Sequence, residues 1–204
     1  MKQYPSIQNI VQSNASVIIQ PKYDGNNIRA EWNKKKGFYK FGTRKQLIDK
    51  NTNIYGISIP IIQNKYEENL SRVFINNRWE NVVCFFELFG PNSFAGRHAP
   101  ADKLDVILFD ANVFKIGILE PKEFVKTFSS VEIPETLYKG QLNQQIVEEI
   151  KFGTFLGATF EGVVCKGKGK HKGQPLMFKI KTRAWIEKVK IYCGNDEKKL
   201  MELL

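Results

Sequence analysis

SVIIQPKYDGNNIRAEW, residues 16–32, is the stretch that decides the fold of this 204-residue chain. Two apolar runs, Ser16–Gln20 and Asn27–Trp32, lie on either side of a turn that contains Gly25. Both runs are short and rich in β-branched or aromatic residues, which is typical of strands. A lysine in the turn between them, Lys22, is therefore expected at the mouth of a sheet rather than on a mobile surface helix.

The turn Lys22-Tyr23-Asp24-Gly25 contains residues with chemical uses. The amine of Lys22 becomes a nucleophile once it has lost its proton, and nearby cations or a metal ion promote that loss. Asp24 could orient the amine, and Gly25 lets the backbone approach a ligand closely. A turn of this kind also arises by chance, so the rest of the chain has to decide between an enzyme and a structural hairpin.

Further patterns predict an α+β fold. Additional strands are expected at Val82–Leu88, Val106–Asp110, Phe160–Lys166 and Leu176–Ile180, with residues 167–173 as a flexible hairpin tip. Helices are expected at Pro60–Phe74, Pro121–Phe128, Gln141–Phe152 and Thr182–Tyr192, the last with Trp185, Val189 and Tyr192 as its apolar stripe. Because the strands are clustered with helices inserted between them, we expect largely antiparallel sheets in a single domain over residues 1–204.

Charged residues at the ends of these strands are candidates for a site. Glu87 lies in a strongly apolar run, and Glu161 opens another. Carboxylates are rarely buried in such runs unless they are paired or bind a ligand. Lys179 and Lys181 end the next strand, and the period of two places both amines on one face. Two ammonium groups on one face repel each other unless an anion lies between them, and a phosphate would serve.

Composition narrows the class of protein. The formal net charge of +10 favours a polyanionic partner. No phosphate-binding loop of the GxxxxGK[ST] type and no GxGxxG fingerprint occurs. Basic clusters that are either a nucleic-acid track or solvated surface lie at residues 34–36, 44–45, 97–98, 166–172 and 188–190. The two histidines, His98 and His171, lack metal-ligand spacing and are interpreted as surface or phosphate-contacting residues.

The cysteines and the N-terminus indicate the compartment. Cys84, Cys165 and Cys193 are widely separated, which argues against a disulfide framework or a zinc site. Cys84 and Cys165 lie in apolar runs and are expected to be buried thiols. The first residues are too polar for a signal peptide, and no run approaches the length of a membrane span. We therefore expect a cytoplasmic or intracellular protein without a membrane span, encoded by a cell or by a virus or phage.

A family resemblance follows from the order of these motifs. The segments KYDGNN (22–27), FFELFG (85–90), VILFDANV (106–113), EGVVCKG (161–167) and MFKIK (177–181) resemble motifs I, III, IIIa, IV and V of the covalent nucleotidyltransferases. That superfamily contains ATP-dependent DNA ligases, RNA ligases and mRNA capping enzymes. The resemblance covers most of the chain and implies an ATP-grasp-like domain of antiparallel sheets flanked by helices.

The resemblance also implies a role for each catalytic residue. Lys22 would attack the α-phosphate of ATP and form a lysyl–AMP intermediate, with Asp24 and Gly25 completing the turn. Lys179 and Lys181 would neutralise the α-phosphate, the electrostatic role expected in phosphoryl transfer. The cofactors implied are ATP and Mg²⁺ or Mn²⁺.

Nucleotide and metal contacts are implied in the same way. Glu87 would contact the ribose hydroxyls, Phe109 would stack on the purine, and Glu161 would help to place the metal. By itself Phe109 is an ordinary core aromatic. Arg44, in Gly42-Thr43-Arg44, resembles an arginine that contacts the ribose or the substrate phosphate, and by spacing alone it is equally well a surface residue.

Within the superfamily the motifs resemble those of RNA ligases. Motif I ends in Asn27, as in nick-sealing RNA ligases, where the asparagine supports phosphodiester formation. Residues 182–204 are too few for an OB-fold, so no OB domain is expected. Motif V runs directly into a helix, as in RNA ligases. Phe86 departs from the pattern, since many relatives have a small residue there. The further C-terminal domain of nick-sealing ligases is not expected in this sequence, which is therefore interpreted as either a minimal ligase or a catalytic-domain fragment.

The sequence therefore predicts an ATP-dependent RNA ligase that joins 5′-phosphate and 3′-hydroxyl ends, acting as a monomer in RNA repair. Its expected substrate is a nick in duplex RNA or in an RNA–DNA hybrid. The alternatives are a minimal DNA ligase, a fragment of a capping guanylyltransferase, and a nucleic-acid-binding module that has kept the fold and lost catalysis.

Overall fold

The computed structural model of the chain describes residues 1–90 and 103–203 and divides it into two compact units. Arg97 and His98 lie outside the described residues. The first unit consists of Met1–Pro5, Gly25–Pro134 and Gly169–Pro175, and the second of Ser6–Asp24, Glu135–Lys168 and Leu176–Leu204. The chain thus leaves the second unit and enters the first between Asp24 and Gly25, within the KYDGNN segment. The single domain expected over residues 1–204 stays a prediction.

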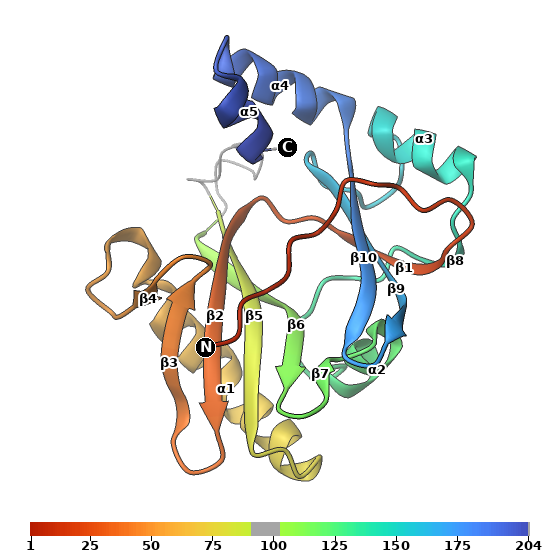
Figure 1. Cartoon of the computed structure of the whole chain (residues 1–204). Helices are drawn as coiled ribbons and strands as arrows, with labels where there is room; N and C mark the ends of the chain where they lie inside the picture. Colours follow the sequence, from red (N-terminus) through yellow and green to blue (C-terminus); the bar gives the residue numbers. More distant parts are fainter. Residues whose placement is uncertain (91–102, 204) are drawn as a thin grey trace. The chain divides into compact units, whose positions relative to one another are not determined.

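The first unit is built on a six-stranded antiparallel sheet with strand order β4-β3-β2-β5-β6-β7 (Figure 1). Its strands are β2 (Gly25–Asn33), β3 (Gly37–Thr43), β4 (Leu47–Ile48), β5 (Asn81–Phe89), β6 (Asp105–Val113) and β7 (Gly117–Ile118). The sequence predicted β2, β5 and β6, whose apolar runs are long. It missed the others, since β4 and β7 are two-residue strands and β3 is interrupted by charge and glycine.

A long helix covers one face of this sheet. It is α1 (Ser58–Asn76), preceded by the short 3₁₀ helix η1 (Asn53–Tyr55), and α2 (Pro121–Thr127) adds to the same core. The period of two in the strands places Ile28 and Phe86 on the helix side, where Tyr66 and Phe74 of α1 pack against the sheet. Each fully buried side chain of this size contributes about 1.5–3 kcal/mol relative to exposure.

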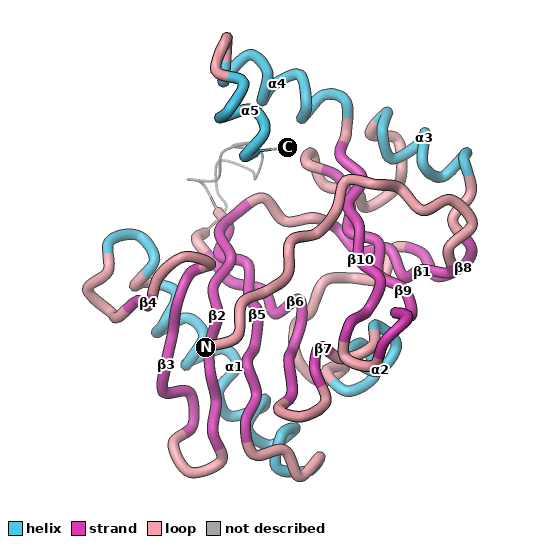
Figure 2. Tube along the Cα trace, in the orientation of Figure 1, coloured by secondary structure: helices cyan, strands magenta, loops and turns pink. Residues whose placement is uncertain are grey.

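The second unit is built on a four-stranded sheet with strand order β10-β9-β1-β8 (Figure 2). Its elements are β1 (Ser16–Pro21), β8 (Tyr138–Gln141), β9 (Gly162–His171), β10 (Gln174–Lys181), α3 (Gln144–Phe152), α4 (Arg183–Cys193) and α5 (Glu197–Leu203). The ends of β9 and β10 within Gly169–Pro175 belong to the first unit. β1 is antiparallel to both β8 and β9. Val17 and Ile19 of β1, Val163 of β9 and Ile180 of β10 bury one apolar face together with Ile150 of α3.

Capping residues fix where the helices of the second unit begin. The side chain of Asn143 accepts a hydrogen bond from Ile146 N, and that of Thr182 accepts one from Trp185 N. These two residues are the N-caps, so α3 and α4 begin slightly later than the apolar periodicity alone predicts. α4 buries Trp185, Val189 and Cys193, whereas Tyr192 is 54% exposed. The predicted stripe was therefore wrong at Tyr192, whose ring instead lies 3.9 Å from Lys199 Nζ of α5.

The glycine-rich segment at residues 167–173 is not a flexible tip. β9 continues through it to His171, and only Lys172 and Gly173 form the turn before β10. Strand pairing overrides the low intrinsic strand propensity of glycine and lysine here because antiparallel partners satisfy the backbone hydrogen bonds.

Cys84 and Cys165 are free and fully buried, as predicted. Burial raises the pKa of the Cys165 thiol to about 12, so it is unreactive at neutral pH. No helix in the described part of the chain is both long enough and apolar enough to cross a membrane.

Candidate active site

The backbone of Lys22 is held by the segment that contains motif IV. Lys22 N donates a hydrogen bond to Gly162 O (3.0 Å). The hydroxyl of Thr159 donates to Lys22 O (2.5 Å) and accepts from Gly162 N (3.2 Å). Gly162 has φ of +131°, and a Cβ there would meet the carbonyl oxygen of Ile180. The turn that carries Lys22 therefore depends on a glycine and a threonine distant in sequence.

One carboxylate joins two of the predicted catalytic lysines. Glu161 Oε2 lies 2.9 Å from Lys22 Nζ, and Glu161 Oε1 lies 3.4 Å from Lys181 Nζ. The Glu161 and Lys181 side chains are only 5% and 6% exposed, whereas that of Lys22 is 21% exposed. The more accessible amine is thus the one expected to attack, and the buried carboxylate holds both amines in place.

Lys181 has an unusual environment for a lysine. Its pKa is lowered to about 8, mainly by burial; Glu161 opposes this decrease, and Lys179 and Lys22 contribute to it. Its Nζ lies 3.6 Å from the centroid of the Trp185 ring and donates a hydrogen bond to Leu203 O (2.7 Å) in the last turn of α5. Leu203 O thus accepts one of the hydrogen bonds that the Lys181 amine could otherwise donate to an α-phosphate oxygen.

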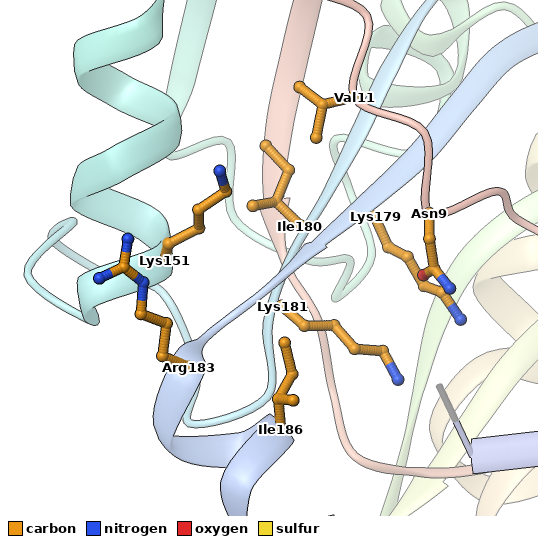
Figure 3. A pocket seen from close by; sticks show the side chains of 8 residues that line it. All are labelled: Asn9, Val11, Lys151, Lys179, Ile180, Lys181, Arg183 and Ile186. Carbon is orange, nitrogen blue, oxygen red and sulfur yellow. The ribbon is translucent and has the colours of Figure 1, made fainter. Parts of the chain in front are cut away.

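A cavity of about 450 Å³ opens beside these lysines (Figure 3). Both Lys179 and Lys181 line it, which places their side chains on a common opening as the strand period predicted. The remaining lining comes from the N-terminal segment, α3, β10 and α4: Asn9, Val11, Lys151, Ile180, Arg183 and Ile186. Every one of these residues belongs to the second unit.

In the first unit, the predicted nucleotide-contacting residues share the sheet face opposite α1. Asn27 of β2 pairs directly with Glu87 of β5, so their side chains are neighbours on one face. Asn27 Oδ1 is buried and has no hydrogen-bond partner among the described residues. Such an acceptor costs free energy unless a ligand or water supplies a donor.

A β-bulge places Phe109 on this face. Phe86 pairs with Leu108 and Phe85 with Asp110, so Phe109 is the extra residue of β6. Because the bulge shifts the alternation, Phe109 and Asp110 both reach Tyr4, while Leu108 stays in the core behind.

Tyr4 completes an aromatic cluster that the sequence did not reveal. Its ring centroid lies 4.9 Å from those of both Phe85 and Phe109, and its hydroxyl donates to Asp110 Oδ2 (2.7 Å). Burial, and then Asp110 and Glu87, raise the pKa of Tyr4 well above its usual value, whereas Arg44 lowers it. Phe109 therefore packs against this phenol, and Glu87 and Arg44 act on it electrostatically. A tyrosine in a polar N-terminal segment carries no sequence signal for this role.

The N-terminal residues are fixed by Arg29, which is 4% exposed. Its Nε donates to Thr43 O (2.8 Å), and its Nη1 lies 3.2 Å from both Met1 O and Lys2 O. Burial lowers the pKa of this guanidinium from its ordinary value.

The structure therefore brings the predicted residues together in two groups. Lys22, Glu161, Lys179 and Lys181 form one group in the second unit; Asn27, Arg44, Glu87 and Phe109 lie in the first. Asp24 is the last residue of its segment in the second unit. The sequence missed Thr159, Tyr4, Asp110, Asn9, Lys151 and Arg183, because each is an ordinary polar residue whose neighbours come from distant segments.

Comparison with solved structures shows which proteins share this fold. An RNA ligase of Naegleria gruberi with AMP and Mn matches with a TM-score of 0.65 and 17% identity, covering 92% of this chain and 58% of that one. The same ligase with PPi matches at 0.64 and 19%, covering 88% and 53%. A variant with ATP and Mn matches at 0.62 and 18%, covering 86% and 52%.

These matches establish the fold. The chain shares the antiparallel-sheet fold of this RNA ligase, and the α+β prediction is confirmed. It spans just over half the length of the ligase chains. No protein-family model matches the chain, and no curated protein does.

Proposed function

We propose that the protein is an ATP-dependent RNA ligase that acts through a lysyl–AMP intermediate on Lys22. The single observation that carries the proposal is Glu161, a buried carboxylate within 2.9 Å of the amine of Lys22 and 3.4 Å of that of Lys181. A partly exposed amine beside a buried one, both fixed by one carboxylate, fits a nucleophile next to a phosphate-binding group. The fold shared with an RNA ligase that binds ATP and Mn supports the same reading.

In the first step, deprotonated Lys22 Nζ attacks the α-phosphorus of ATP. The nitrogen–phosphorus bond forms, the bond to the bridging oxygen breaks, and pyrophosphate leaves with the electron pair, while a proton of the amine passes to water. Lys179 and Lys181 stabilise the charge on the α-phosphate. Glu161 positions the attacking amine, and this kind of positioning supplies a large part of the rate in phosphoryl transfer.

Glu87 and Phe109 would bind the ribose and purine. Phe109 is the partly exposed member of the aromatic cluster, with the buried rings of Tyr4 and Phe85 packed against it, so its ring is the one that can stack on a purine. The buried Oδ1 of Asn27, which lacks a partner among the described residues, needs a donor such as a hydroxyl group. The aromatic side chains and the carboxylate thus suit the two parts of a nucleoside.

The donor set fits a magnesium or manganese ion. The described residues contain no group of three or more His, Cys, Asp or Glu side chains that could hold a metal alone. Mg²⁺ is commonly held by one or two carboxylates together with phosphates and water, so Glu161 would be its protein ligand. When bound, such an ion neutralises phosphate charge and favours the neutral amine of Lys22.

The later steps transfer AMP and seal the strand. A 5′-phosphate oxygen attacks the phosphorus of lysyl–AMP, the nitrogen–phosphorus bond breaks, and Lys22 regains its proton. A 3′-hydroxyl then loses its proton and attacks the 5′-phosphorus, and AMP departs. We propose nicked duplex RNA or an RNA–DNA hybrid as substrate, supported by Asn27 in motif I and by the net charge of +10.

Intact-mass spectrometry after incubation with ATP and Mg²⁺ tests the first step. Wild-type protein is expected to gain one AMP, and Lys22→Ala to gain none. GTP in place of ATP serves as the nucleotide control, and a GMP adduct would identify a capping-type guanylyltransferase instead.

Nicked duplexes in which only one strand is changed from RNA to DNA then test the substrate. Faster sealing of RNA ends supports the proposal, and preference for all-DNA nicks would identify a DNA ligase. If the purified protein carries no adduct and forms none with either nucleotide, the alternative of a nucleic-acid-binding module with this fold would be favoured.

A further inference from the structure

The cavity beside Lys179 and Lys181 is larger than a single phosphate group. Its lining contains four basic side chains and, among the described residues, no carboxylate. Figure 3 shows Lys179 and Lys181 extending to one side of β10, and Lys151 and Arg183 lying on the other. Two pairs of cations thus flank the end of one strand.

The second pair is held in place by its neighbours. Glu148 Oε1 lies 2.9 Å from Lys151 Nζ, and Glu148 Oε2 lies 3.1 Å from Arg183 Nη2. The guanidinium of Arg183 also lies 3.9 Å from the centroid of the Phe152 ring. The hydrogen bond from Lys151 is the main cause that lowers the pKa of Glu148, so this carboxylate stays charged. The two cations are therefore oriented before any ligand arrives, which reduces the entropy lost on binding.

The size of the cavity favours a nucleotide over a pyrophosphate. Its volume of about 450 Å³ lies in the range of roughly 300–1,000 Å³ that accepts whole small molecules. Val11, Ile180 and Ile186 add apolar side chains to the lining of the same cavity. Alternating phosphate and apolar surface is the pattern of a nucleic-acid strand, and a pyrophosphate has no apolar part.

The position of the cavity also fits the entering strand. In-line displacement at phosphorus places the attacking and leaving groups on opposite sides. In the AMP-transfer step the leaving group is the amine of Lys22, so the 5′-phosphate has to approach from the far side of the α-phosphate. Lys179 and Lys181 line the cavity and Lys22 does not, which is compatible with an approach from this side.

We infer that this cavity binds the 5′-phosphorylated RNA strand, with Lys151 and Arg183 contacting strand phosphates next to the joining end. The inference rests on the proposed function, because that function supplies the strand. Lys151 and Arg183 act as binding residues for the second substrate and take no part in the reaction of Lys22 with ATP. Each lost phosphate contact reduces the salt dependence of binding by about one counterion.

The test compares Lys151→Ala/Arg183→Ala with wild type and with Lys139→Ala, which removes an exposed lysine at the opposite edge of the same sheet. Binding of a fluorescent RNA that carries a 5′-phosphate or a 5′-hydroxyl is measured at several salt concentrations. Self-adenylylation by ATP, and its reversal by added pyrophosphate, are followed by intact mass. Melting temperatures establish that all three proteins are folded.

We expect the double variant to bind the 5′-phosphorylated RNA at least tenfold more weakly with a smaller salt slope, while adenylylation and its reversal stay within twofold. A variant that binds RNA normally but needs more ATP or pyrophosphate would assign the cavity to the leaving pyrophosphate and overturn the inference. A double variant equal to Lys139→Ala in all assays would overturn it as well. Failure of the proposed ligase function can be told apart from failure of this inference, because the wild-type protein would then form no AMP adduct.

Discussion

Replacing Thr159 by valine tests whether the backbone contacts of Lys22 position the nucleophile. The hydroxyl of Thr159 lies 2.5 Å from Lys22 O and 3.2 Å from Gly162 N, and valine has nearly the same shape without that hydroxyl. Thr159→Ser keeps the hydroxyl and loses only a methyl group, so it is the matched control.

The expected magnitude follows from these two hydrogen bonds. Each contributes about 1 kcal/mol net, so Thr159→Val should lower the free energy of unfolding by about 2 kcal/mol. For a chain of this size that corresponds to a fall in melting temperature of roughly 4–8 °C. Because small displacements of a reacting group reduce rates strongly, up to about a hundredfold for 1 Å, we expect adenylylation of Lys22 to slow by about tenfold or more.

The assay is the single-turnover rate of AMP adduct formation at saturating ATP, followed by intact mass, together with thermal unfolding. A purely structural role would lower the melting temperature and leave the rate in the folded protein unchanged. The positioning argument would be refuted by a Thr159→Val protein with wild-type rate below its melting temperature, or by Thr159→Ser slowing as much as Thr159→Val.

Three further predictions concern the surroundings of the same lysines. The pKa of Lys181 is lowered to about 8, so its charge is lost above that pH and the KM for ATP should rise. Arginine stays charged, so Lys181→Arg should flatten this rise in a pH series of adenylylation rates. Ending the chain after Asp196 removes α5 and frees the amine of Lys181 from Leu203 O. A hydrogen bond from a charged group contributes about 1.5 kcal/mol, so the KM for ATP should fall by up to about tenfold. An equal or higher KM in a folded protein would contradict this prediction. Gly162→Ala should lower the free energy of unfolding by more than about 1–3 kcal/mol, because a positive φ and a clash with a carbonyl oxygen combine there. Gly153 also has a positive φ but open space around it, so Gly153→Ala should lower the melting temperature less.

Sequence pattern was sufficient for the elements whose signal is local. The apolar runs of β1, β2, β5, β6, β9 and β10 are long enough to predict strands without knowledge of their partners. The helices α1, α3 and α4 followed from periodicity, although α3 and α4 begin later than predicted, after their caps Asn143 and Thr182. Lys179 and Lys181 were correctly placed on one opening because the strand period is a local property.

Tertiary structure alone decided which distant groups meet. The pairing of Glu161 with both Lys22 and Lys181 joins segments that no local rule connects. The bulge that turns Phe109 and Asp110 toward Tyr4 depends on the register with β5, which a single strand does not encode. The extent of β9 and the exposure of Tyr192 depended on neighbouring strands and on α5. In each case the deciding free energy comes from contacts between segments far apart in the chain. The sequence therefore determined the secondary-structure elements and the candidate residues, and the tertiary structure determined which of these residues are in contact.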